Sequence, residues 1–419
     1  MASLAPYDEL VPHPPADARL AARFAELRAM RPAADLGRVR ELVVVVSSSR
    51  GGCTLLGELL RRCPSLLSLP AESNPYVVVA QLGGDDPAGI VAAELARAVG
   101  APARPGDPLG ATGLAREWAW RMRAQWPHAD IAPERVMSWV REAGEGDPAA
   151  TAAFVLARAR GADPAIDARR YDLGPSAPRG RPPAGPPGEL LVEMPPFVVP
   201  RPWRRAGDDE LAARPLVIAT PRNAYRVRFL AGLVPGARLR LLHLVRNPAA
   251  AVNGLLDGWR HHGFFNCRMP RDLAIRGYDE GAPWARRWWK YDVPPGWEAV
   301  AGATLAEVCA LQWRSAHEAA LDAAGELGAD RHTVRYEDLV GPPPARAAAA
   351  RALEGWLGIP AGELEPLVVE GLDPVMATAP PRPGRWRARE AELAPVLADP
   401  AVLGLAERLG YRPDPAGWA

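Results

Sequence analysis

The feature that most constrains the fold is an uninterrupted apolar run, ELVVVV (41–46), followed at once by SSSRGG and by a helical pattern over 54–63. Continuous apolarity, in contrast to alternation, is typical of a strand buried on both faces of a helix-covered parallel sheet. A strand, a glycine-containing loop and a helix also form an arrangement in which backbone amides and a helix N-terminus hold an anion. This stretch therefore predicts a βα unit with an anion site at its turn.

The rest of the chain repeats this alternation of strand and helix patterns. Short apolar runs predict strands at 190–194, 215–220, 240–245 and 332–336. Helical periodicity predicts helices at about 16–30, 86–99, 112–125, 133–143, 248–260, 304–327, 345–357 and 388–409. The alternation predicts an α/β fold in which helices flank a P-loop-like parallel sheet.

The order of these patterns also predicts the domain organisation. Residues 1–40 are expected to form an N-terminal arm and helix, and residues 41–419 a single domain. Within that domain, residues of about 85–190 indicate a largely helical insertion after the first βα unit. The insertion ends in GPSAPRGRPPAGPPG (174–188), whose prolines and glycines exclude a regular element and predict an exposed loop.

Composition narrows the class of protein. Fifty basic and 49 acidic residues leave a net charge of +1, which argues against binding nucleic acid or a membrane surface through bulk charge. The chain has no apolar run of the roughly 18 residues that a membrane helix needs, and its first residues lack the apolar core of a signal peptide. Four scattered cysteines, with no CxxC pair, predict neither a disulfide framework nor a zinc site (Cys53, Cys63, Cys267, Cys309). We therefore expect a cytoplasmic enzyme that needs no metal.

The first motif whose residues could bind an anion is the turn SSSRGGCTLL. A kinase or NTPase P-loop requires GxxxxGK[ST], and the only lysine of this chain is Lys290, far along the sequence. Here Arg50 supplies a planar fork for an oxyanion, Gly51 and Gly52 permit close backbone approach, and Thr54 adds a hydroxyl at the start of the helix. Taken alone, the loop fits a strand-to-helix turn with no ligand equally well.

A second basic turn follows a later strand in LLHLVRNPAAAVNG (241–254). Arg246 ends the strand, and Pro248 is suited to the first turn of the next helix. Because the carboxyl ends of parallel strands share one edge of a sheet, this arginine is expected at the same ligand-binding edge as the first loop. A structural salt bridge is the alternative. His243, inside the same apolar strand, is expected to be a buried, hydrogen-bonded histidine.

Together with VRYEDLV (334–340), GRW (384–386) and LGY (409–411), these turns resemble the sulfotransferase family that uses 3′-phosphoadenosine 5′-phosphosulfate (PAPS). The resemblance is to the bacterial and tyrosylprotein-like branch and covers about 41–75 and 215–412. It implies a 5′-phosphosulfate site at Arg50, Gly51, Gly52, Cys53, Thr54 and Leu55. It implies a 3′-phosphate site at Arg246, Asn253 and Gly254, and further cofactor contacts at Tyr336 and Arg385.

Two positions depart from the family pattern. Gly254 stands where the family has a serine that binds the 3′-phosphate, and either Asn253 or a backbone amide is expected to replace it. Cys53 stands where the family has a small hydroxyl residue, and a thiol is a weaker hydrogen-bond donor.

The resemblance implies sulfuryl transfer to an acceptor hydroxyl or amine, in which the protein positions an in-line attack and neutralises charge. Arg50 is expected to neutralise charge on the transferring group, and Glu72 in SLPAESNPY to act as the general base. A structural glutamate remains the alternative for Glu72, and His261 or His262 are alternative bases. Lys290, the only lysine, is expected either to serve as a compact, titratable cation or to have no functional role.

The acceptor is expected to be a small apolar or aromatic metabolite, with a peptide as the alternative. Four tryptophans suggest an aromatic wall for such an acceptor, although core packing explains such clusters more often (Trp284, Trp288, Trp289, Trp297). Two other functional classes stay open. One is a nucleotide-dependent kinase or NTPase, which the missing lysine disfavours. The other is a non-catalytic descendant that binds a nucleotide or a partner, which Cys53 and Gly254 favour. The oligomeric state is not specified by any sequence feature.

Overall fold

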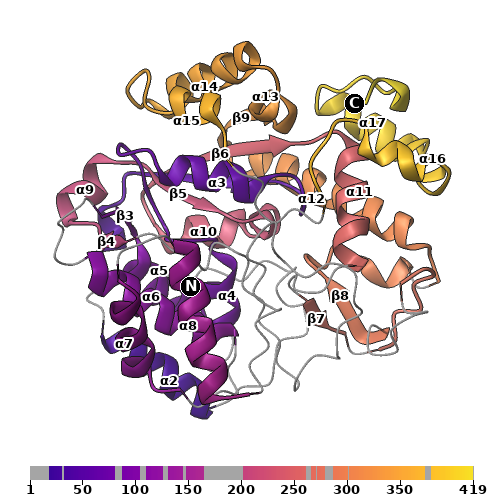
Figure 1. Cartoon of the computed structure of the whole chain (residues 1–419). Coiled ribbons are helices and arrows are strands. Elements are labelled where there is room, and N and C mark those ends of the chain that lie inside the picture. The colour runs from indigo at the N-terminus through magenta and orange to yellow at the C-terminus, as the bar shows by residue number, and fades with distance from the viewer. Residues whose placement is uncertain are drawn as a thin grey trace.

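A computed structural model describes residues 18–30, 33–80, 87–103, 110–125, 131–144, 148–164, 202–260, 266–269, 271–278, 286–300, 302–372 and 379–418. Its main sheet has seven strands in the order β4-β3-β2-β5-β1-β6-β9 (Figure 1). Their bounds are β1 (Glu41–Val46), β2 (Leu67–Ser68), β3 (Gly100–Pro102), β4 (Trp203–Arg205), β5 (Leu216–Ala219), β6 (Arg238–Val245) and β9 (Asp330–Arg335).

Five of these strands are parallel. β1 pairs in parallel with β5 and β6, β2 pairs in parallel with β5, and β6 pairs in parallel with β9. The predicted parallel, helix-flanked sheet is confirmed for them. β3 differs, because it pairs antiparallel with both β2 and β4. Gly100 makes that edge possible, since a Cβ there would lie 1.9 Å from the carbonyl oxygen of Arg204.

Both faces of β1 are covered, as its continuous apolar run predicts. Val43 and Val45 pack with side chains of α3 (Cys53–Arg61), α14 (Pro343–Leu357) and α15 (Glu365–Glu370). Val44 and Val46 belong to the larger core on the opposite face. In Figure 1, α14 and α15 lie above the sheet and the helices of the insertion lie below it.

Six further predicted helices lie close to their expected positions: α2 (Ala18–Ala29), α5 (Pro87–Ala98), α6 (Gly110–Gln125), α7 (Pro133–Ala143), α11 (Pro248–Arg260) and α12 (Leu305–Glu326). The structure adds helices that were not predicted: α4 (Asn74–Ala80), α8 (Pro148–Ala162), α9 (Asp208–Ala213), α10 (Val227–Leu233), α13 (Tyr336–Val340) and α15. The single helix predicted over 388–409 is wrong. It is divided into α16 (Glu390–Leu397) and α17 (Pro400–Arg408), because Asp399 caps the second helix and Pro400 begins it.

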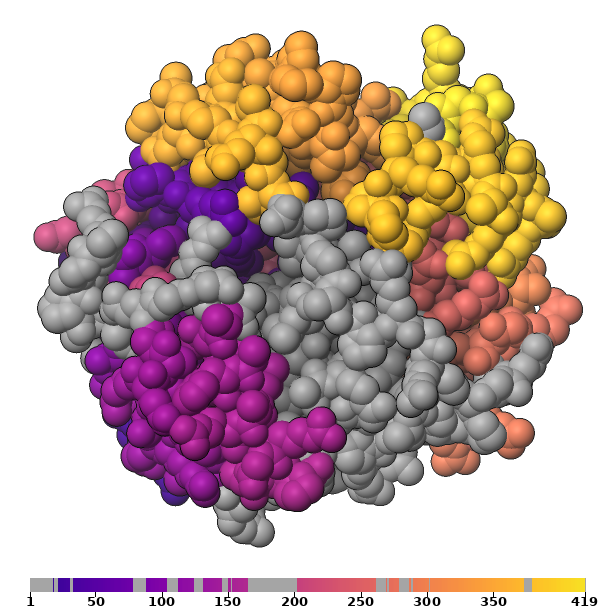
Figure 2. Space-filling model, in the orientation of Figure 1, coloured from indigo at the N-terminus to yellow at the C-terminus, as the bar shows by residue number. Residues whose placement is uncertain are grey.

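The insertion after the first βα unit is largely helical where it is described, as predicted. α5 to α8 make up this part, and their residues appear in purple to magenta at one side of the molecule, opposite the yellow C-terminal residues (Figure 2). Tyr76 stacks on Trp120 with ring centroids 4.5 Å apart, and Phe24 of α2 contacts the same indole. The expected strand at 190–194 and the loop at 174–188 lie outside the described residues.

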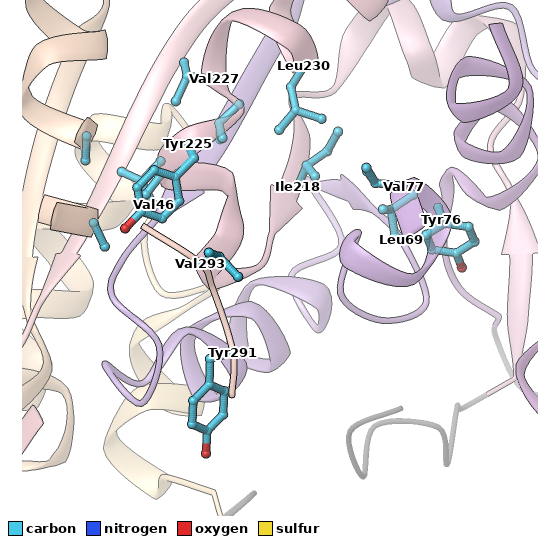
Figure 3. Close-up of a cluster of buried hydrophobic side chains, with 14 of the residues drawn as sticks. Val46, Leu69, Tyr76, Val77, Ile218, Tyr225, Val227, Leu230, Tyr291 and Val293 are labelled. Atoms are coloured by element: carbon cyan, nitrogen blue, oxygen red, sulfur yellow. The ribbon is translucent and has the colours of Figure 1, made fainter. Parts of the chain in front are cut away.

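A second, two-stranded sheet follows α11. It consists of β7 (Asn266–Arg268) and β8 (Trp288–Lys290), paired antiparallel. The chain after β8 enters the core, where Tyr291 and Val293 belong to the same buried cluster as Val46 and Tyr225 (Figure 3). This brings a segment from the second sheet to the carboxyl end of β1.

Two histidines are buried together between the sheet and α12. The prediction for His243 is confirmed: its side chain has no exposed surface, and its Nε2 lies 2.9 Å from Nδ1 of His317. Burial, reinforced by the charges of His317 and Arg331, holds the pKa of His243 well below 6.5, and burial lowers the pKa of His317 to about 3. Both rings are therefore neutral in the folded protein at physiological pH.

Because both histidines are neutral when buried, we predict that the folded protein loses stability on acidification. Above the unfolded pKa of about 6.5 neither state is protonated, whereas below it the unfolded chain takes up protons that the folded pair refuses. Each histidine then costs about 2 kcal/mol of folding free energy near pH 5. His317→Gln should weaken the fall in Tm between about pH 7.5 and 5, measured by circular dichroism. An equal fall in Tm for the wild type and His317→Gln would contradict the prediction.

Among the helices that the structure describes, none is long and apolar enough to span a bilayer.

Candidate functional site

The five parallel strands direct their carboxyl ends to one edge of the sheet. The turn after β1 carries Arg50, β6 is followed by Arg246, and β9 is followed by Tyr336. Glu72 lies beyond the end of β2, and Thr220 directly follows β5. Residues that are distant in the sequence are therefore brought together at the edge where open α/β sheets bind ligands.

The turn after β1 has a backbone that only particular residues permit. Arg50 has φ +63°, and Gly52, at the N-cap of α3, has φ +101°. A Cβ on Gly52 would lie 2.2 Å from the ring of Tyr336, so no larger residue fits there. A Cβ on Gly51 would lie 2.3 Å from Oγ of Ser47. Both glycines are thus needed for the shape of the turn, independently of any ligand.

The three serines before Arg50 were not selected from the sequence, although SSS directly after the strand was a visible signal. The hydroxyls of Ser47 and Ser48 are buried and have no hydrogen-bond partner. Ser49 donates its hydroxyl to Oδ1 of Asp292 at 2.5 Å. Buried hydroxyls without partners are costly, and an anion beside this turn would supply acceptors for them.

The two basic turns are in direct contact. Nη1 of Arg246 donates to the carbonyl oxygen of Arg50 at 3.0 Å, and the Arg246 guanidinium lies 4.4 Å from the centre of the Tyr336 ring. Burial lowers the pKa of Arg246 from 12.5, with smaller opposing effects of Tyr336 and Glu337. Nε of Arg246 is buried without a hydrogen-bond partner. The structure thus brings the expected 5′-phosphosulfate and 3′-phosphate turns together.

A half-buried carboxylate, that of Glu337, joins this edge to the C-terminal segment. Oε1 of Glu337 accepts hydrogen bonds from the backbone amide and the side-chain amide of Asn247, at 3.0 and 2.8 Å. Oε2 accepts from the hydroxyl of Tyr411 at 2.8 Å, and burial together with Glu337 raises the pKa of that tyrosine. VRYEDLV and LGY, two of the motifs behind the resemblance, are therefore joined in space.

The expected contact at Arg385 has an ion-pair partner. Arg385 and Arg389 both donate to Asp257 of α11, each at 2.5 Å. Arg389 also donates to Oδ1 of Asn253 at 3.0 Å. The positive charge of Arg385 helps to lower the pKa of Arg246, which indicates that the two guanidinium groups lie within electrostatic range. Arg385 and Arg389 therefore contact the helix that follows the second basic turn, and of the two only Arg385 was predicted from the sequence.

Gly254 leaves room for Arg50. A Cβ at Gly254 would lie 3.3 Å from Cβ of Arg50, and its carbonyl oxygen accepts from Nε of Arg50 at 3.3 Å. A serine here would press against the arginine of the first turn. The structure therefore gives a packing reason for the departure from the family pattern at this position.

Cys53 is buried at the first residue of α3. Burial raises the pKa of its thiol well above 9.0, with a contribution from Glu72. The thiol is therefore neutral, and a role as an activated thiolate does not fit it. Leu55, the last residue of the expected loop site, packs against the core between α3 and the sheet.

Glu72 is directly connected to the first turn. Its Oε1 accepts from the hydroxyl of Thr54 at 2.9 Å, and its Oε2 accepts from Thr220 at 2.8 Å. Burial raises the pKa of Glu72 from 4.5, while the two hydroxyls, then Arg61 and Arg121, oppose that shift. A buried carboxylate with a raised pKa is a candidate general base.

Other polar residues near Glu72 escaped the sequence analysis. Oδ1 of Asn74 accepts hydrogen bonds from Arg222 at 3.4 Å and from Arg226 at 3.0 Å. Arg222 belongs to the 3₁₀ turn η5 (Pro221–Tyr225), which follows β5, and its charge also acts on Asp292. These residues lie on isolated short elements with no periodic pattern, so only the fold reveals that they converge.

Several residues that the sequence suggested for a functional role lie in the core. Trp289 is fully buried and packs edge to face against Trp259 and Trp297, with centroids 5.2 and 6.0 Å away. These rings fill the core and do not form an exposed aromatic wall. Lys290 is buried as well. His261, His262 and Trp284 lie outside the described residues, as does the side chain of Trp288.

Within the described part of the chain, no group of three or more histidine, cysteine, aspartate or glutamate side chains has a geometry for holding a metal ion.

Comparison with known proteins gives matches among solved structures only. No family model matches the chain, and no curated protein matches it. A sulfotransferase domain from the curacin biosynthetic pathway is 15% identical, with 90% of this chain and 99% of that chain covered and a TM-score of 0.36. A sulfotransferase domain from the Synechococcus PCC 7002 olefin synthase is also 15% identical, with 89% and 95% covered and a TM-score of 0.39. At these values, a functional conclusion depends on the residues of the site.

Proposed function

We propose that this chain is a sulfotransferase that takes PAPS as cosubstrate and transfers its sulfuryl group to a hydroxyl or amine of an acceptor. The observation that carries the proposal is the contact between the two basic turns, in which Arg246 donates to the carbonyl oxygen of Arg50. PAPS has two separate anionic groups, and two adjoining basic turns at one sheet edge suit such a ligand.

The first turn fits a phosphosulfate group chemically. Ser47 and Ser48 have buried hydroxyls that lack acceptors, Gly52 has no side chain at the helix start, and Arg50 adds a planar charged fork. Arg246 would hold the 3′-phosphate, with Arg385 and the Asn253 amide nearby. PAPS, when bound, would supply the sulfuryl group and leave as 3′,5′-ADP. The chain's own contribution is to orient and neutralise these anions.

Glu72 would hold the proton that the acceptor releases. The hydroxyls of Thr54 and Thr220 fix both carboxylate oxygens, and each oxygen keeps a second lone pair for the acceptor proton. Because Thr54 belongs to the first turn of α3, the same contact sets the carboxylate close to the expected phosphosulfate site. We propose a small metabolite as the acceptor, with a peptide as the alternative.

The proposal is tested by titrating the purified protein with 3′,5′-ADP, 5′-AMP and ATP in a calorimeter. We expect micromolar binding of 3′,5′-ADP, much weaker binding of the other two, and sulfation of a hydroxyl compound when PAPS and an acceptor panel are supplied. Binding of ATP without 3′,5′-ADP would overturn the proposal in favour of a kinase-like enzyme. Binding of 3′,5′-ADP with no turnover on any acceptor would indicate a non-catalytic protein.

A further inference from the structure

A second buried carboxylate contacts the first turn. Asp292 is 1% exposed, and its Oδ1 accepts from the hydroxyl of Ser49, the residue directly before Arg50. Its Oδ2 accepts from the hydroxyl of Tyr225 at 3.4 Å. Burial raises the pKa of Asp292, while Ser49, Arg222 and Tyr225 oppose that shift. None of the roles proposed above uses this side chain.

The backbone of Asp292 is held independently of its carboxylate. Its carbonyl oxygen accepts from Nε1 of Trp289 at 2.8 Å and from Nε2 of Gln312 at 2.7 Å. Tyr291, with φ +65°, packs against α11, where a Cβ on Gly258 would lie 1.8 Å from its hydroxyl. The segment is thus anchored to α11 and α12, and the carboxylate projects from a fixed support to the turn.

The turn itself needs such support. A non-glycine residue in the left-handed region is strained, and Arg50 has φ +63°. Strain of this kind persists only where the surroundings hold the residue in place. On the C-terminal side of the turn, the carbonyl oxygen of Arg50 accepts a hydrogen bond from Arg246. Nε of Arg50 donates to the carbonyl oxygen of Gly254. Before Arg50, the hydrogen bond between Ser49 and Asp292 ties the turn to another part of the chain.

We propose that Asp292 is a positioning residue, which fixes the first turn through Ser49 and so presents Arg50 to the anionic ligand. The inference rests on the proposed function only for the identity of that ligand. The support comes from a segment that follows the second sheet, 243 residues away in the sequence. The conformation of that segment and the shape of the turn are therefore coupled.

The test uses hydrogen–deuterium exchange of the full chain without ligand, followed by titration with 3′,5′-ADP. Asp292→Ala and Ser49→Ala are expected to speed exchange of the amides of residues 47–53 and to weaken 3′,5′-ADP binding about tenfold, the worth of a hydrogen bond to a charged group. Asp292→Asn keeps an acceptor oxygen for Ser49 but loses the charge, so its exchange and 3′,5′-ADP affinity should lie between those of the wild type and the alanine variants. Tyr225→Phe, which removes the longer hydrogen bond to Asp292 and leaves the Ser49 contact in place, is the matched control and should resemble the wild type.

Three outcomes would overturn the inference. The first is unchanged exchange of residues 47–53 in both alanine variants. The second is faster exchange throughout the sheet, β6 included, with a lowered Tm, which would indicate loss of stability alone. A double variant with strictly additive effects would also contradict a direct Ser49–Asp292 contact. Should the wild type fail to bind 3′,5′-ADP, the proposed function falls, whereas the exchange result still decides the role of Asp292.

Discussion

Replacing Arg246 with alanine is expected to weaken the binding of 3′,5′-ADP by about 10- to 100-fold, because hydrogen bonds to charged groups contribute about 1.5–3 kcal/mol. The effect should exceed that of any other single arginine. Arg246 is aligned by Tyr336, has a buried Nε without a partner, and also donates to the turn that would hold the other anionic group. Isothermal titration of the purified variant measures the change.

The conservative variant separates charge from geometry. Arg246→Lys keeps a positive charge but loses the planar fork, so it should bind 3′,5′-ADP with an affinity between those of the wild type and the alanine variant. Arg238→Ala is the matched control, since Arg238 lies at the opposite end of the same strand, 65% exposed and paired with Asp330. If Arg238→Ala weakened binding as much as Arg246→Ala, a local phosphate site at Arg246 would be wrong.

The sequence was sufficient to predict four of the five parallel strands, β1, β5, β6 and β9, because each includes a short run rich in apolar or β-branched residues. The two-residue strand β2 was not predicted. β1 was predicted with its observed bounds, Glu41–Val46, since a strand buried on both faces leaves no ambiguity of pattern. β3 and β4 were missed, because three residues with a glycine and a proline, or with two arginines, have no strand periodicity. Their positions depend on antiparallel pairing between segments that are distant in the sequence.

The candidate site residues that belong to a local sequence motif could be predicted from the sequence. Arg50 and Arg246 stand in recognisable turns, and parallel strands place such turns on one edge. Thr220, Arg222 and Asp292 have no such motif, and each acquires its neighbours only when distant elements pack. The hydrogen bond between Ser49 and Asp292 spans 243 positions, so no local pattern could have indicated it.

Glu72→Gln is the second variant with a large expected effect. Removing a general base should lower kcat by about 10²- to 10⁴-fold. Binding of 3′,5′-ADP should stay within a few-fold of the wild type, because the glutamine oxygen and amide still engage Thr54 and Thr220 by hydrogen bonds. The measurement is the initial rate of sulfation of the best acceptor from the panel, together with titration of the nucleotide.

The pH dependence gives the sharper test of this role. A protonated carboxyl cannot accept the acceptor's proton, so kcat/KM of the wild type should fall as pH drops through the pKa of Glu72. Burial raises that pKa above 4.5, which moves the acid limb to higher pH. Thr220→Val removes a hydrogen bond that favours the ionised form and should move the limb higher still. An unshifted limb in Thr220→Val, or an unchanged limb in Glu72→Gln, would assign the proton to another group.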